Sequence, residues 1–152
     1  MSENFSDNQY VTISAEGSGG IYEYQLDDNV YQDSPTFNNV PYGEHIVTVR
    51  DKNGCGITQI PILVINYLKY FTPNNDNVND TWNVIGLETD LTSNVFIYDR
   101  YGKLLTQVQP FGNGWDGFYN NERLPATDYW FVVTYTQDGI PKEFKSHFTL
   151  KR

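Results

Sequence analysis

The residues best suited to chemistry lie in one segment, Phe71–Trp82, which holds a proline and six Asn or Asp side chains. Asn74, Asp76 and Asp80 stand at positions i, i+2 and i+6, and side-chain oxygens alternating along a short loop are typical calcium ligands. A loop of the EF-hand type would carry an acid where this chain has Val78. The alternative is that the same oxygens accept hydrogen bonds from the loop's own backbone. The sequence leaves both open.

The three tryptophans, Trp82, Trp115 and Trp130, are a second candidate site. Trp115 lies in the glycine-rich segment Gly114–Gly117, next to Asp116. A tryptophan face can bind a sugar or a cation. A tryptophan between glycines can equally close one end of a β-sandwich, and we favour that interpretation for Trp115. A carbohydrate-binding or adhesive module remains the alternative function.

A partner-binding surface is the third candidate. Trp130 must point to the opposite side of its strand from Tyr129 and Phe131, so one of these two faces is covered by another layer or exposed to a partner. Basic side chains are concentrated in the second half of the chain and could meet an acidic partner or merely protect strand edges. The basic residues concerned are Arg100, Lys103, Lys145, Lys151 and Arg152.

Catalysis has little support. His45 and His147 are the only histidines, and each falls in a predicted strand. Cys55 is the only cysteine, so the chain cannot form an internal disulfide. Nucleophile elbows, zinc motifs and phosphate-binding loops are not found in the sequence. We therefore expect a protein that is not an enzyme.

The net charge limits which classes of partner the protein can bind, and its uneven distribution suggests two domains. The net charge of −9 argues against nucleic acid, which requires a basic face. Residues 1–67 hold nine acids against two bases, a charge of −7, whereas residues 68–152 hold ten against eight, a charge of −2. A transmembrane segment is not expected, because no apolar stretch approaches the ~20 residues that span a bilayer.

The apolar residues alternate in short segments separated by turn residues, which predicts strands rather than helices. In the first half Val30-Tyr31 begins a short extended piece, and Thr36-Phe37 leads into a corner. The predicted strands are Tyr10–Ala15, Ile21–Leu26, Glu44–Arg50 and Ile57–Ile65. Pro61 marks the last of them as an edge strand or a bulge. Strands every eight to twelve residues are typical of a small sandwich.

The second half repeats this pattern. Its predicted strands are Trp82–Gly86, Asn94–Tyr98, Leu104–Val108, Asp128–Tyr135 and Phe144–Arg152. Asn94–Tyr98 is apolar on both faces and should be central in its sheet, and the polar connection Glu88–Ser93 has room for one helical turn. The predicted fold is all-β, with two small Ig-like β-sandwich domains in tandem, residues 1–67 and 68–152.

The second domain resembles a known family, the type B C-terminal sorting domain of type IX secretion, also called the gliding-motility-associated C-terminal domain. The matching motifs follow the family's order. They are Phe71–Trp82 with Pro73, Phe96–Lys103, Gly114–Gly117, Leu124-Pro125, Asp128–Phe131 and Phe148–Arg152. The family carries glycines where this loop has Asn75 and Asn77, and Asn tolerates positive φ best among the other residues, so we expect the loop conformation to be kept.

The first domain resembles, more loosely, the Ig-like or adhesin-type repeats that precede such domains. The residues concerned are Tyr22–Tyr24, Ser34–Phe37 and Val47–Cys55. The resemblance implies a secretion signal that directs a cell-surface adhesin through the periplasm to the outer surface. Its implied partners are the type IX machinery and a PorP/SprF-like outer-membrane protein, and residues 1–67 would be the passenger.

Overall fold

The computed structural model describes residues 4–7, 9–15, 19–54 and 56–152. All regular secondary structure in this part of the chain is β-strand, so the all-β prediction is confirmed. Within it, no helix is present that is long and apolar enough to cross a membrane. The chain divides into two compact units, Met1–Asn66 and Tyr67–Arg152. Cys55 lies outside the described residues.

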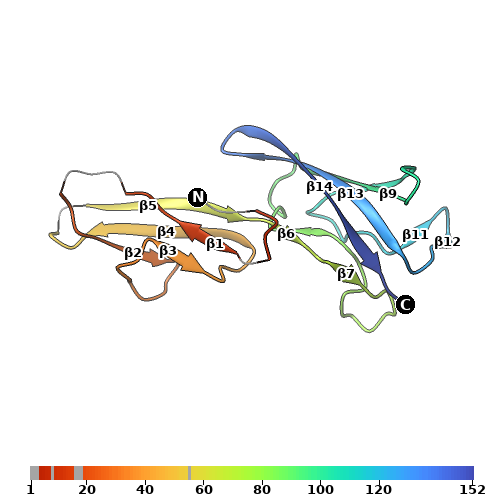
Figure 1. Cartoon of the computed structure of the whole chain (residues 1–152), viewed down its shortest axis with the longest axis horizontal. Helices are drawn as coiled ribbons and strands as arrows, with labels where there is room; N and C mark the ends of the chain where they lie inside the picture. The colour runs from red at the N-terminus through yellow and green to blue at the C-terminus, as the bar shows by residue number, and fades with distance from the viewer. Residues whose placement is uncertain (1–3, 8, 16–18, 55) are drawn as a thin grey trace. The chain divides into compact units, whose positions relative to one another are not determined.

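The first unit, coloured red to yellow in Figure 1, is built from two small antiparallel sheets. One sheet is a pair of three-residue strands, β1 (Tyr10–Thr12) and β3 (Thr36–Asn38). The other has the order β2-β4-β5, with bounds Tyr22–Leu26, Gly43–Asp51 and Ile57–Val64. As Pro61 predicts, β5 is an edge strand, in which Pro61 lies opposite Ile46.

The core of the first unit lies between these two sheets. The alternation predicted for the first strand is observed, because Val11 and Ile13 are both buried. They belong to one cluster with Phe37 from β3 and with Val47 and Val49 from β4. Burial of this shared apolar surface is the dominant favourable term that holds the two sheets together.

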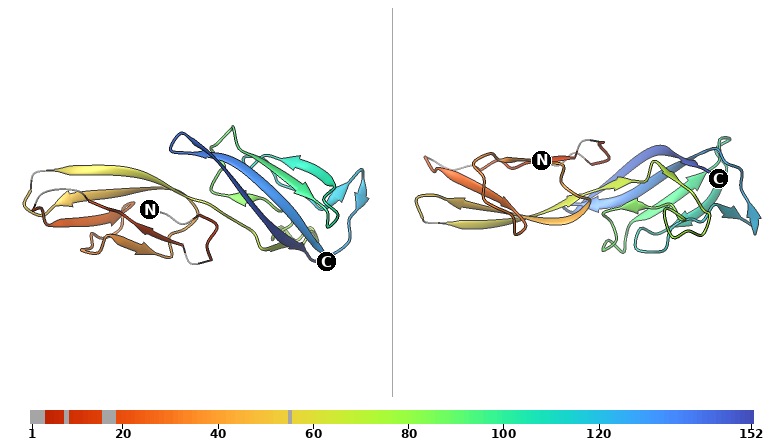
Figure 2. Two further views of the ribbon diagram at one scale, coloured as in Figure 1. Left: turned by 45° about the horizontal axis from the view of Figure 1, so that its top comes forward. Right: turned by 90° about the horizontal axis from the view of Figure 1, so that it is seen from below.

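The second unit, coloured green to blue in Figure 1, is organised around a five-stranded sheet of order β10-β9-β13-β14-β7. Both views in Figure 2 show its long hairpin of β13 and β14 in blue. Its strands are β7 (Tyr70–Phe71), β9 (Asn94–Tyr98), β10 (Leu104–Val108), β13 (Asp128–Gln137) and β14 (Ile140–Leu150). The strand β9 has a partner on each side, as its two apolar faces predict.

Two short strand pairs accompany this sheet. The pair β6 (Asn66–Tyr67) and β8 (Val84–Ile85) forms one. The other is a hairpin of β11 (Phe118–Tyr119) and β12 (Glu122–Arg123). Its two turn residues, Asn120 and Asn121, have φ of 51° and 63°, the positive values that a tight two-residue hairpin needs.

The structure corrects one sequence-based expectation in this unit and adds two features that were not predicted. Glu88–Ser93 contains turns and no helical turn. The approach to the Asn-Asp segment contains the strands β6 and β7. The last strand, β14, pairs in parallel with β7, which places Leu150 opposite Phe71. A two-residue strand carries too little pattern to be predicted, and its partner lies at the other end of the domain.

Candidate functional site

The Asn-Asp loop, residues 72–80, folds around the carboxylate of Asp80. One oxygen of Asp80 accepts hydrogen bonds from the backbone N–H groups of Asn74 (2.9 Å) and Asn75 (2.7 Å), and the other accepts one from Asn77 (2.8 Å). Burial by itself raises the pKa of Asp80, but the backbone donors outweigh it and hold the pKa below its ordinary value. The charged carboxylate therefore stabilises the loop.

The remaining calcium candidates are held in the same way. Asn74 Oδ1 accepts the N–H of Asp76 (3.0 Å), and Asp76 Oδ1 accepts the N–H of Val78 (2.8 Å). The other oxygen of Asp76 accepts the side-chain amide of Asn74 at 2.9 Å. All the side-chain oxygens that the sequence offers to calcium thus accept hydrogen bonds within the loop. This geometry favours the self-capped alternative, and calcium binding stays a prediction.

The loop backbone takes the conformation that glycine residues would favour. Asn75 and Asn77 have φ of 63° and 65°, and Asn79 has a φ of 52°. Positive φ at the first two positions agrees with the expectation drawn from the family's glycines. Asn fits here because its short side chain tolerates the left-handed region.

The residues that flank the loop belong to the core. Phe71 and Trp82 are fully buried, and the ring of Trp82 stacks on Phe148 with centroids 3.8 Å apart and an angle of 11° between the planes. The indole N–H of Trp82 donates to the carbonyl of Leu68 at 2.6 Å. Pro73 is half-buried at the start of the loop. The loop is therefore fixed at both ends by aromatic packing.

The Gly114–Gly117 segment crosses directly over Trp82. The backbones of Trp82 and Trp115 exchange two hydrogen bonds of 2.9 Å each. Gly114 sits so close that a Cβ there would lie 2.5 Å from the carbonyl oxygen of Trp82. Trp115 is buried, and Asp116 accepts the N–H of Phe118 at 3.0 Å. Since Trp82 and Trp115 are both buried, only Trp130 can offer an open ring face to a sugar.

Trp130 lies on the side of the five-stranded sheet that faces away from the core. Its neighbours on β13, Tyr129 and Phe131, are 3% and 1% exposed, whereas Trp130 is 42% exposed. Such alternation is what a strand with one buried face must show. An exposed tryptophan in the middle of a central strand indicates a binding surface.

The pairing of β13 with β9, and of β9 with β10, places further apolar residues beside Trp130. Trp130 lies opposite Tyr98 of β9, which in turn lies opposite Leu104 of β10. One row further along, Val132 lies opposite Phe96. We call this surface the outer face. Its members are Phe96, Tyr98, Leu104, Trp130, Val132, Lys145 and His147.

The predicted basic residues separate into two groups. Lys145 and Lys151 lie on the Trp130 side of the sheet, where Lys145 pairs with Glu143 at 3.3 Å and Lys151 lies 4.2 Å from the ring centre of Tyr70. Arg100 and Lys103 belong to the turn between β9 and β10. Two of the predicted cations therefore border the apolar part of the sheet surface, and two lie at its end.

The guanidinium of Arg152 forms hydrogen bonds to backbone carbonyl groups of its own domain. It donates to the backbone carbonyl of Leu124 at 2.9 Å and 3.1 Å, and to that of Gly117 at 3.4 Å. Burial, and then repulsion from Arg123, lower the pKa of Arg152. Arg152 thus ties the end of the chain to the β11–β12 region.

The histidines lie in different units. His45 contacts the carboxylate of Asp27 at 2.8 Å and the carbonyl oxygen of Pro41 at 2.9 Å. His147 lies on the outer face, 3.7 Å from Asp128. Each histidine therefore has a neighbouring carboxylate of its own, on a different sheet.

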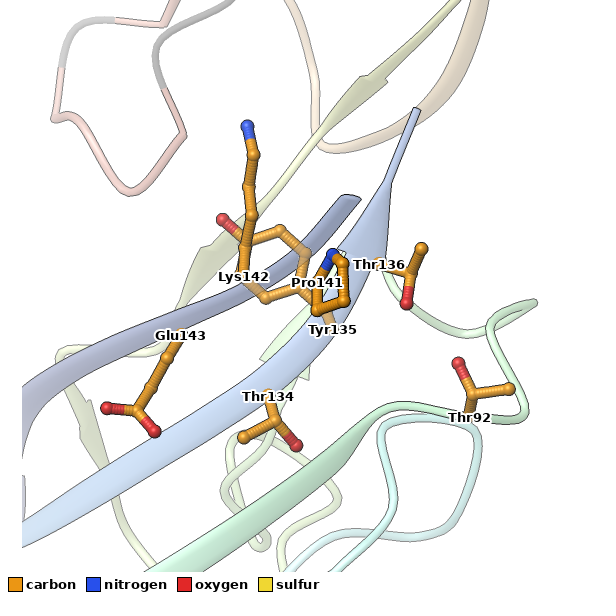
Figure 3. A pocket seen from close by; sticks show the side chains of 7 residues that line it. All are labelled: Thr92, Thr134, Tyr135, Thr136, Pro141, Lys142 and Glu143. Atoms are coloured by element: carbon orange, nitrogen blue, oxygen red, sulfur yellow. The ribbon is translucent and has the colours of Figure 1, made fainter. Parts of the chain in front are cut away.

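A pocket of about 380 Å³ lies beside the β13–β14 hairpin. Figure 3 shows the hydroxyl-bearing side chains of Thr92, Thr134 and Thr136 along it. The ammonium group of Lys142 and the carboxylate of Glu143 point in different directions. The pocket offers hydroxyl groups, but its two charged groups do not converge on one point.

Sequence reasoning named Trp130 but missed its neighbours. Phe96, Tyr98, Leu104 and Val132 join Trp130 only through the pairing of β9, β10 and β13. A signal was available in the second apolar face of Asn94–Tyr98. That face was interpreted as evidence for a central strand, and it also supplies the aromatic rings of the outer face.

Comparison with known proteins identifies the second unit. The family described as CHU_C type IX secretion signal domain matches residues 65–150, which run from the strand β6 to the end of β14. No curated protein matches the chain. A solved structure described as "Biofilm associated protein - BSP domain" is similar over 97% of this chain and 27% of that chain, with 14% identity and a TM-score of 0.31. Since the family match spans more than half of the sequence, the chain belongs to the CHU_C type IX secretion signal domain family.

Proposed function

We propose that the outer face is the surface through which the type IX machinery binds this domain, and that the binding protein is a PorP/SprF-like outer-membrane protein. The first unit is then a passenger, an adhesin-type repeat delivered to the cell surface. The domain acts by recognition and not by catalysis.

One observation carries this proposal. Trp130 is 42% exposed although its neighbours on the strand, Tyr129 and Phe131, are buried, and it is surrounded by further apolar side chains of the outer face. Burying such a patch against a partner supplies a hydrophobic driving force. Aromatic residues are also the side chains most enriched among those that dominate binding energy at interfaces.

The basic side chains would make this contact selective for an acidic partner. Lys145 and Lys151 lie on the same side of the sheet as Trp130, in a chain whose net charge is −9. An acidic loop on the partner would be attracted to these two lysines. Charged residues at the rim of an interface act mainly on the association rate and on specificity.

The test is export of a fluorescent reporter fused in front of the whole chain, in a host with a type IX system, with and without its PorP/SprF-like protein. We expect protease-accessible reporter at the cell surface only when that protein is present. Trp130→Ala should leave the reporter in the periplasm. Leu91→Ala is the matched control, because Leu91 is 73% exposed on a loop outside the outer face.

Periplasmic reporter from the parent chain in both hosts would contradict the sorting function, and surface reporter in both hosts would contradict the proposed partner. Normal export of the Trp130→Ala variant would show that the outer face is not the surface that binds. Glycan binding by the purified chain, lost in Trp130→Ala, would instead support the carbohydrate-binding alternative.

A further inference from the structure

A second pocket, of about 280 Å³, lies at the end of the five-stranded sheet, between the β9–β10 turn and the segment that leads into β13. Tyr129 and Leu105 contribute its buried and half-buried apolar surface. Tyr119, from the β11–β12 hairpin, contributes a further aromatic ring. Arg100 and Lys103 complete the lining with two exposed cations. This pocket lies apart from the Trp130 region and is lined by other residues.

The two cations differ from three other basic residues of the protein, which form ion pairs. Arg50 pairs with Glu23, Lys52 with Asp33 and Lys145 with Glu143. In the described part of the chain, by contrast, neither Arg100 nor Lys103 forms an ion pair.

An aromatic ring lies near each of these cations. The ammonium group of Lys103 lies 4.7 Å from the ring centre of Tyr119, and the guanidinium of Arg100 lies 5.8 Å from that of Tyr101. A cation placed over a ring keeps most of its N–H donors available. Both cations thus keep N–H donors available for a ligand.

The carboxylate closest in sequence, Asp99, already holds the turn together. One of its oxygens accepts the backbone N–H groups of Tyr101 (2.8 Å) and Lys103 (2.9 Å). The pocket lining therefore has two cations against one carboxylate, and that carboxylate is engaged in the turn. An additional carboxylate from outside would complete the charge balance.

We propose that this pocket binds a carboxylate side chain of an acidic peptide segment, with an adjacent apolar residue of that peptide packing on the half-buried Tyr119 and Leu105. Arg100 and Lys103 donate hydrogen bonds to the carboxylate. The inference rests on the proposed function only for the identity of the protein that carries the peptide. It deepens that function by adding a second contact, chemically distinct from the outer face.

The test is titration of the purified, isotopically labelled whole chain with a capped hexapeptide of alternating Glu and Leu. We expect saturable shifts of the backbone amide signals of Tyr101, Lys103, Tyr119 and Thr127, all of which line the pocket. The corresponding hexapeptide of Gln and Leu should bind at least about fivefold more weakly, because it lacks the charge.

Variants of the chain test whether the acidic peptide binds at Arg100 and Lys103. Arg100→Gln and Lys103→Gln should each weaken binding of the acidic peptide by about two- to fivefold, the range expected for a partly exposed ion pair. Lys142→Gln is the matched control, since it removes an exposed lysine that lines the other pocket. This variant should bind like the parent chain.

Three results would overturn the inference: no saturable shifts at these amides, equal binding of the Gln peptide, or an equal loss of affinity in Lys142→Gln. The outcome is independent of the export experiment. Absence of peptide binding leaves the effect of Trp130→Ala on secretion untouched, and export of the Trp130→Ala reporter leaves peptide binding untouched.

Discussion

At the scale of single residues, Asp80 does the most to shape the Asn-Asp loop. Three backbone N–H groups, from Asn74, Asn75 and Asn77, point at its carboxylate. Successive N–H groups directed at one point form an anion-binding concavity, and here the anion is a side chain of the same loop. The loop is thus held by a charge that it supplies itself.

Replacing this charge should change how stability depends on pH. A carboxylate whose pKa in the folded state lies below its unfolded value stabilises the protein above the unfolded pKa, and this contribution is lost as the pH falls through the folded pKa. The pKa of Asp80 is lowered. We therefore expect Asp80→Asn to melt at a lower temperature than the parent at pH 7, and to lose less stability between about pH 5 and about pH 3.

Thermal unfolding followed by tryptophan fluorescence at several pH values measures this difference. Glu122→Gln, which removes an exposed carboxylate on β12, is the control and should follow the parent curve. Parallel curves for the parent and Asp80→Asn over the whole pH range would show that Asp80 does not contribute in this way.

At the scale of elements, the second unit is held together where two loops cross. Trp82 follows the Asn-Asp loop, and Trp115 lies within the Gly114–Gly117 segment, yet their backbones exchange two hydrogen bonds. Trp82 then stacks on Phe148 of β14. The crossing connects both loops to the five-stranded sheet, and it requires the two backbones to approach closely at Gly114.

Substitutions at two glycines can separate the energetic cost of a strained backbone conformation from the cost of a steric contact. Gly114 and Gly102 have similar φ, +82° and +80°, but an added Cβ would meet the Trp82 carbonyl oxygen at 2.5 Å in the first case and nothing within 4 Å in the second. We expect Gly102→Ala to lower the free energy of unfolding by about 1 kcal/mol, from backbone strain alone. Gly114→Ala should lower it by about 3 kcal/mol, because the contact adds to the strain.

Denaturant unfolding followed by tryptophan fluorescence compares these variants. Losses of equal size would mean that the crossing can open slightly to accept a methyl group. In that case the close approach at Gly114 would not be essential to the fold.

At the scale of the whole molecule, the two units carry different spectroscopic probes. All three tryptophans lie in the second unit, whereas the core cluster of the first unit contains aliphatic residues, tyrosine and phenylalanine. Tryptophan fluorescence therefore reports on the secretion signal alone, and circular dichroism reports on both units. Independent folding of the first unit can be tested without cutting the chain.

Val47 is the residue for this test, because it is fully buried in the core of the first unit. We expect Val47→Ala to destabilise the first unit by about 2 kcal/mol through the cavity it leaves. The far-ultraviolet transition should then broaden or split, while the midpoint measured by tryptophan fluorescence stays where it is in the parent. A shift of the fluorescence midpoint of the same size would show that the two units unfold together.

The sequence by itself determined the all-β class, most strand positions and the turn residues. Alternation in Glu44–Arg50 and Asp128–Tyr135 follows directly from the two-residue period of a strand. Asn75 and Asn77 stand where the family that the second domain resembles has glycines, and this resemblance predicted their positive φ because Asn tolerates it best among the other residues. The motifs from Phe71 to Arg152 also pointed to the secretion family, which the match over residues 65–150 confirms.

Tertiary structure alone decided what surrounds each of these residues. Local pattern showed that Trp130 and its neighbours on β13 lie on opposite faces, but not which face is exposed. That depended on the packing of Trp82, Phe148 and the other rings on one side of the sheet. The pairing of β7 with β14, and the placement of Tyr119 beside Lys103, join residues far apart in the chain. Such contacts form because the whole core must bury its apolar surface at once, and no local spacing records them.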